Sequence, residues 1–273
     1  MSRFSECFLL VFGQLAVGGL AGLAVPPFGM IERGFFKSSA AVYLGCALLF
    51  LAGRAWLAVR AGGIAPQATV ELTLWVLFTL ALGLYLATLW EDDGRRRARL
   101  FPIALALGVV ALAASAGAYR LGPLLSPATV LWPLAFLTGA LVLGGVATGM
   151  SLGHWYLIDL GLSIEPLRRL FHYFVGVLVV QLAVIACVVL AAALVPGPGS
   201  DAVALLWHDH GNLLAMRLVL GPVAALGLGY LIHRTLQIPQ TMAATGLFYI
   251  AILAVMVGEL LGRLILFRTS LPL

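Results

Sequence analysis

Eight apolar stretches, separated by short polar connectors, fill almost the whole chain. An α-helix needs about 20 apolar residues to cross the hydrocarbon core of a membrane, and each stretch is at least about that long. Strands are excluded because barrel strands alternate polar and apolar residues, whereas these runs are continuously apolar. We predict an all-α bundle of eight transmembrane helices, over residues 4–25, 39–60, 69–90, 101–120, 127–158, 171–195, 212–234 and 240–267.

The composition agrees with a membrane protein and leaves no room for a soluble domain. Hydrophobic residues make up 62% of the chain, charged residues 10%, and the mean hydropathy is +1.08. Too little polar surface remains to cover a water-soluble body of 273 residues. We therefore expect residues 1–273 to form a single integral membrane domain that is surrounded by lipid.

The basic residues are concentrated in alternate connectors, and this bias predicts the orientation of the chain. Under the positive-inside rule these connectors are cytoplasmic, so both termini and the connector 201–210 are extracytoplasmic. This predicts a multi-pass protein of the cell inner (cytoplasmic) membrane. The net charge of +5 then reflects topology, and we expect no nucleic-acid partner. The basic connectors contain Arg33, Lys37, Arg95, Arg96, Arg97, Arg99, Arg168, Arg169 and Arg234.

Motifs for self-contained chemistry are missing from the sequence. The cysteines occur singly, which argues against iron–sulfur and structural zinc sites, and we expect no metal site. We find no Walker loop, G-x-S-x-G or H-E-x-x-H string. Small residues one helical turn apart instead predict close helix packing. They are Gly18/Gly22, Gly145/Gly149/Gly153 and Gly258/Gly262.

Five charged residues lie at similar depth in the predicted outer half of the membrane. Such residues are costly in hydrocarbon, so we expect them to converge inside the bundle. They could form a structural ion-pair network, or an outward-facing pocket in which a carboxylate exchanges protons with a bound quinone. His210, with its neighbours His208 and Asp209, could pass protons onward. The five residues are Arg54, Glu71, Arg217, Glu259 and Arg263.

A second group of polar and aromatic residues lies near the predicted cytoplasmic side. Trp and Tyr at this depth often form an interfacial belt. Imidazoles beside aromatic rings could also bind a quinone headgroup, and two facing imidazoles could ligate a b-type haem. All three histidines are close to helix ends, which favours quinone over haem. The group consists of His154, Trp155, Tyr156, His172 and His233.

Three short strings and their positions carry a resemblance to a known family. They are Phe12-Gly13-Gln14 followed by Gly18-Gly19, Glu71 at the start of the third predicted helix, and Gly258-Glu259-Leu260-Leu261-Gly262-Arg263. These strings resemble the membrane anchor subunits of the dimethyl sulfoxide reductase type. That group, the NrfD-like superfamily, includes the polysulfide and nitrite reductase anchors. The family's eight helices and two external termini match the predicted topology.

The resemblance implies a subunit that exchanges electrons and protons between menaquinone or ubiquinone and an iron–sulfur partner, which serves a catalytic subunit. Glu71 would take the place of the family's acidic residue near the quinol. The chain departs from the family where the second predicted helix ends, because it has Gly53-Arg54-Ala55-Trp56-Leu57 and lacks the family's His-Leu-Gly-x-Pro string. The family's quinol histidine therefore has no counterpart here.

Three classes of function remain open from the sequence. The first, which we favour, is a non-catalytic, quinone-interacting anchor of an oxidoreductase complex. The second is an electron-transfer subunit with haem b bound by two of His154, His172 and His233. The third is a non-redox scaffold or transporter.

Overall fold

The predicted all-α transmembrane bundle is confirmed by a computed structural model. It describes residues 2–60, 66–91, 93–121, 123, 125–159, 161–194, 197–238 and 240–273, and these ranges contain no strand. Within these ranges, eight helices are long and apolar enough to cross a membrane. The helical elements are α1 (Ser2–Gly22), α2 (Arg33–Arg60), α3 (Pro66–Thr88), α4 (Gly94–Gly117), α5 (Ala128–Trp155), α6 (Glu165–Leu194), α7 (Pro198–Asp209), α8 (Gly211–Leu218), η1 (Val219–Val223), α9 (Ala224–Gln237) and α10 (Thr241–Thr269).

Several helices extend beyond their apolar runs at the end that carries the basic connectors. α2 begins at Arg33 and not at residue 39, and α4 begins at Gly94 and not at residue 101. Side chains at the membrane surface are solvated, so the backbone can stay helical after the apolar run has ended. Asp93 supports this at α4, where its side chain accepts hydrogen bonds from the backbone N–H groups of Arg95 and Arg96.

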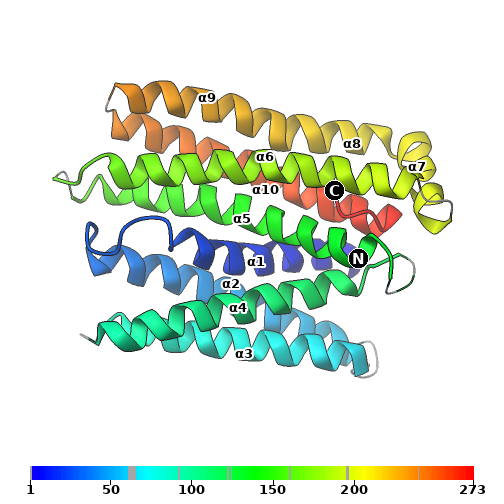
Figure 1. The fold of residues 1–273 in the computed structure, drawn as a ribbon, viewed down its shortest axis with the longest axis horizontal. Coiled ribbons are helices and arrows are strands. Elements are labelled where there is room, and N and C mark those ends of the chain that lie inside the picture. Colours follow the sequence, from blue (N-terminus) through cyan, green and yellow to red (C-terminus); the bar gives the residue numbers. More distant parts are fainter. Residues whose placement is uncertain are drawn as a thin grey trace.

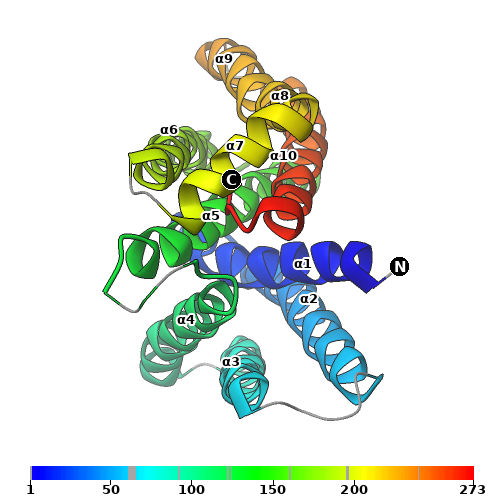
Figure 2. The same ribbon diagram turned by 90° about the vertical axis from the view of Figure 1, so that its right-hand side faces the viewer.

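The long helices lie side by side along the longest axis of the molecule, with α1 and α5 at the centre (Figure 1). The end view places α2, α3 and α4 on one side of this pair, and α6, α9 and α10 on the other (Figure 2). Both termini and α7 lie at one end of the bundle, opposite the α9–α10 connection (Figure 1). This agrees with an even number of crossings. The sidedness of the two ends stays a prediction.

Glycines allow the central helices to approach each other closely. A methyl group on Gly18 of α1 would overlap the backbone of Ala140 in α5, and one on Gly144 would overlap Gly18 in return. Gly22, one turn further along α1, faces the Thr148 side chain in the same way. The predicted packing role of these small residues is confirmed.

One helix lies where the sequence predicts only a polar connector. α7 is built from Pro198 to Asp209, after Gly197, whose φ of 136° suits glycine. Pro198 stands at the first helical position, where its missing N–H is not needed. The buried face of α7 is apolar and contains Ala202, Val203 and Leu206.

Candidate functional site

Glu259 of α10 forms the centre of a buried ion network in the half of the bundle nearer the termini. Its Oε1 atom lies 2.7 Å from Nη2 of Arg217 in α8, and its Oε2 atom lies 3.3 Å from Nη2 of Arg263. The three side chains are only 1–2% exposed. The Gln181 amide of α6 donates to Oε1 at 2.5 Å, and Arg217 donates through Nε to the Leu273 carbonyl at 3.3 Å. Helices α6, α8 and α10 are therefore joined through one carboxylate.

The backbone around this network is irregular. The seventh span changes from α-helical to π-helical over η1, which contains Pro222. Proline removes a backbone donor and distorts the helix, and π-helical turns occur often at functional sites. Gly221 in this turn approaches Gly258 of α10 so closely that a methyl group on either would have no room. The turn brings Arg217 within reach of Glu259.

The Glu259 network carries unsatisfied donors. Two guanidinium groups share one carboxylate, and the Nε and Nη1 atoms of Arg263 are buried with no hydrogen-bond partner. The guanidinium of Arg263 lies 4.2 Å from the centre of the Phe136 ring, a cation–π distance. Gln14 donates to the Phe136 carbonyl at 3.0 Å, while its own Oε1 atom has no partner.

A second network surrounds Glu71 in the same half of the bundle. Arg54 of α2 donates to Glu71 of α3 at 2.6 Å, and Ser115 of α4 donates to the other carboxylate oxygen at 2.7 Å. The Trp75 indole in turn donates to Ser115 at 2.9 Å. Glu6 of α1 lies 3.9 Å from Arg54, at the more exposed edge of the network. This network joins α1, α2, α3 and α4.

The five predicted charged residues are thus drawn inside the bundle, but as two networks. Arg54 and Glu71 pair between the adjacent helices α2 and α3, whereas Arg217, Glu259 and Arg263 pair between α8 and α10. Residues from neither network line the four pockets described below. The described contacts join the five residues into two networks, and the shared quinone cavity that the sequence predicts stays a prediction. His210 lies at the junction of α7 and α8, and no described contact joins its side chain to them.

Two adjoining pockets occur between α6 and α9, toward the end opposite the termini. One has a volume of about 480 Å³ and is lined by Phe171, His172, Tyr230 and His233 together with small apolar residues. The other, of about 250 Å³, shares Phe171 and both histidines and adds Arg168 and Gln237. We call the two together the α6–α9 groove. His172, Tyr230 and His233 are exposed, so the groove opens on the bundle surface, where lipid would lie.

The side chains in the α6–α9 groove are held in defined positions. The His233 ring stacks on Phe171 with ring centres 5.9 Å apart and planes 23° apart. Its Nε2 atom lies 3.0 Å from the Gln237 amide nitrogen, which can only donate. The centre of the His172 ring lies 5.5 Å from that of Phe171, its neighbour in α6.

The remaining members of the predicted cytoplasmic-side group lie outside this groove. The Nδ1 atom of His154 lies 3.2 Å from the hydroxyl oxygen of Tyr249. Trp155 packs on Phe35 with ring centres 6.3 Å apart, and the Tyr156 hydroxyl donates to a backbone carbonyl of the α5–α6 connector. The structure therefore groups His172 with His233 and separates them from the end of α5.

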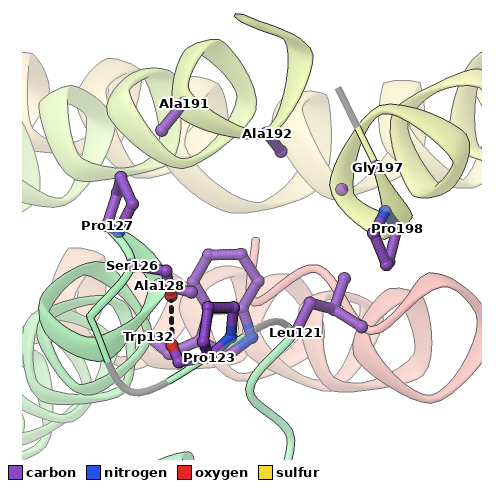
Figure 3. A pocket seen from close by; sticks show the side chains of 11 residues that line it. Leu121, Pro123, Ser126, Pro127, Ala128, Trp132, Ala191, Ala192, Gly197 and Pro198 are labelled. Carbon is purple, nitrogen blue, oxygen red and sulfur yellow. Dashed lines mark hydrogen bonds between the residues drawn. The ribbon is translucent and has the colours of Figure 1, made fainter. Parts of the chain in front are cut away.

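A smaller pocket of about 150 Å³ lies at the opposite end of the bundle, between the α4–α5 connector, α6 and α7. Trp132 stands on one side of it, and Ala192 and Pro198 stand on the other (Figure 3). The indole N–H of Trp132 already donates to the Tyr119 and Ser270 carbonyls, at 3.1 and 3.2 Å. The described lining has no charged side chain, so this pocket offers little for recognising a polar headgroup.

Several important residues were not singled out from the sequence. Gln181 is a lone amide in a long apolar run, and this was a usable signal because buried amides in membranes need partners. Gln14 belongs to a string noted only for the family resemblance. Nothing in the sequence marked Phe171, Tyr230 or Gln237 as part of a binding site, because aromatic and amide groups near helix ends are common.

No family model, curated protein or solved structure matches this chain. The resemblance to the anchor subunits therefore remains a prediction from short strings. Transmembrane architecture is the part of the account that the structure supports directly.

Proposed function

We propose that this chain is a non-catalytic, quinone-interacting subunit of a respiratory electron-transfer complex in the cell inner membrane. The quinone headgroup binds in the α6–α9 groove, between His172 and His233. The observation that carries this proposal is that two histidines from helices far apart in sequence line one groove with Phe171 and Tyr230. The groove opens where a quinone dissolved in lipid would enter it.

The chemistry of the groove suits a quinone headgroup. Its larger pocket, about 480 Å³ in volume, lies within the usual range for small-molecule sites. Imidazole, phenol and guanidinium groups can donate to the two carbonyl oxygens, and the Phe171 face can stack on the ring. Leu226 lines the groove, and Val179 is exposed one helical turn beyond Val175 on α6, so both could contact a prenyl tail.

Residues of this chain would also control the protons of the reaction. Reduction of a quinone consumes protons and oxidation of a quinol releases them. The imidazole of His172 lines the groove and can pass protons to or from a bound headgroup. Under the predicted orientation these protons come from the cytoplasmic side. The electrons would be exchanged with an iron–sulfur partner, and that element rests on the family resemblance alone.

The direct test is the quinone content of the purified protein. Wild-type protein, His233→Ala and the matched control His154→Ala are purified in mild detergent, and bound quinone is extracted and quantified. We expect His233→Ala to retain about tenfold less quinone, which corresponds to about 1.4 kcal/mol of lost interaction. His154→Ala should retain the wild-type amount. Equal retention by all three proteins, or no quinone in wild type after reconstitution with it, would contradict the proposal.

A haem b subunit is the second candidate, because His172 and His233 line the same pocket. The residues fit haem less well than quinone. The Gln237 amide nitrogen lies 3.0 Å from Nε2 of His233, a nitrogen that an axial ligand would use, and both histidines are exposed. A reducible Soret band in purified wild type that disappears in His172→Ala would favour haem.

A transporter is the third candidate, and η1 is the observation that favours it. Transporters often have interrupted helices beside buried charges, and η1 lies next to Arg217 and Gly258. Proton or solute flux in liposomes that contain only this chain would favour transport over the anchor proposal.

A further inference from the structure

A pocket on the far side of the bundle from the α6–α9 groove contains an unusual arginine. The pocket has a volume of about 430 Å³ and lies between the α1–α2 connector, α2, α3 and the start of α4. We call it the Arg97 pocket. It is at the end with the basic connectors, which is predicted to be cytoplasmic, and α4 begins beside it at Gly94. In the predicted orientation, the headgroups of the cytoplasmic leaflet would lie at this depth.

The guanidinium of Arg97 lies over the Phe28 ring, 4.0 Å from its centre, but lacks a full set of hydrogen bonds. Its Nη1 atom is buried and has no partner. Arg97 is the one charged side chain among the described residues that line this pocket. An unpaired cation in a pocket is costly unless an anion binds there.

Two nearby acidic groups in the described part of the chain are engaged elsewhere. Glu91 pairs with Arg96 at 2.9 Å, and the Asp93 side chain caps α4 by accepting from backbone N–H groups. Neither of these two carboxylates is bonded to Arg97, and its Nη1 atom is open to an external anion. The other basic residues of the two connectors add a positive field at the same edge of the bundle.

The rest of the pocket is apolar and aromatic. Phe36 and Tyr85 are buried at 1% and 2% exposure and form its floor, and Phe101 packs edge-on against Tyr85 with ring centres 5.2 Å apart. A free phosphate ion gains nothing from such a wall, whereas the glycerol and upper acyl chain of a phospholipid would be buried against it.

We infer that the Arg97 pocket binds an anionic phospholipid, with the phosphate on Arg97 and the upper acyl chain against the aromatic floor. Basic pockets between transmembrane helices on the cytoplasmic side are a general mode of recognising such headgroups. The site is distinct from the α6–α9 groove and does not depend on the quinone proposal.

Native mass spectrometry of the delipidated full chain tests this, with phosphatidylglycerol as the probe. We expect Arg97→Gln to weaken phosphatidylglycerol binding about fivefold, since one basic group near a lipid headgroup contributes about that factor. The matched control Arg99→Gln removes the same charge from an exposed position outside the pocket. It should bind as wild type does.

A second variant tests the pocket without changing the charge. Ala24 is exposed at its rim, so Ala24→Trp should fill the pocket and reduce binding while Arg97 remains. The Ala24→Trp variant tests phospholipid binding in the pocket even if Arg97→Gln does not fold. Three results would each overturn the inference: equal affinity in wild type and the pocket variants, equally tight binding of phosphatidylcholine, or equally tight binding of inorganic phosphate.

Discussion

At the scale of single residues, the negative charge of Glu259 compensates the positive charges of the buried arginines. Arg217 and Arg263 are almost fully buried, and this one carboxylate accepts from both. Removing one partner of a buried pair leaves the other charge uncompensated, which costs far more than the pair contributes. The network is therefore a structural necessity for the helices that it joins.

Replacement of Glu259 by Gln tests this necessity. We expect the free energy of unfolding to fall by about 3–5 kcal/mol, because two buried guanidinium groups lose their counter-charge. Thermal unfolding in detergent and the yield of folded protein would report the change. Glu165→Gln, which removes the partner of Arg169 in a solvent-exposed pair, should behave like wild type. Wild-type stability in Glu259→Gln would show that the network does not hold the helices together.

Tyr156 predicts a dependence of stability on alkaline pH. Burial raises the pKa of this tyrosine from 10.0 to about 12, because its charged form is poorly solvated in the folded protein. The unfolded chain then releases the proton first, so stability should fall as pH rises from about 10 to about 12, by roughly 2 kcal/mol from this residue.

Thermal unfolding at a series of pH values would measure this effect. Tyr156→Phe should lose less stability than wild type over that pH window, since it has no proton to release. Tyr249→Phe, which alters an exposed tyrosine, should follow the wild-type curve. If Tyr156→Phe and wild type lose stability in parallel, Tyr156 is not responsible.

At the scale of helices, the contact between α1 and α5 depends on residues without side chains. Gly18→Ala places a methyl group in the backbone of α5, at Ala140. Overpacking of this kind costs about 1–3 kcal/mol, and we expect a lower unfolding temperature in detergent. Gly45→Ala is the matched control, because a methyl group there meets no atom within 4 Å. A Gly18→Ala protein as stable as Gly45→Ala would refute close packing at this contact.

Helix ends and interruptions were the hardest elements to predict. The apolar runs marked the spans, but interfacial residues such as Arg33 and Arg95 remain helical beyond them. α7 was missed because Asp201, His208 and Asp209 are typical of a polar loop, although three apolar residues share one face of the helix. The π-helical turn depends on how Pro222 is accommodated against α10, and hydropathy carries no information on that contact.

At the scale of the whole molecule, the sequence predicted how deep each residue lies in the membrane, but not which helices are neighbours. Each span follows from its own apolar run, so eight crossings could be counted without knowing their neighbours. Glu71 and Glu259 lie in the same half of the bundle, as expected. Nothing in the sequence indicated that their side chains would pair with arginines from different sets of helices. In the same way, His154 was grouped with His172 and His233 by depth alone.

The orientation of the bundle can be tested by cysteine labelling in intact cells. In a variant without native cysteines, a cysteine at Asp209 in α7 should react with a membrane-impermeant maleimide, and one at Gly161 should react only after lysis. The reasons are the predicted extracytoplasmic position of α7 and the basic character of the opposite end. The reverse pattern would invert the topology. The native cysteines to be replaced are Cys7, Cys46 and Cys187.

The central claim is that a quinone headgroup binds between α6 and α9. Photocrosslinking with an azido-quinone in native membranes, followed by peptide mapping, tests it most directly. We predict labelling confined to peptides that contain residues 168–176 and 226–237, and competed away by unmodified quinone. Competed labelling of α3 or α10 near Glu71 or Glu259, with none on α6 or α9, would contradict the account.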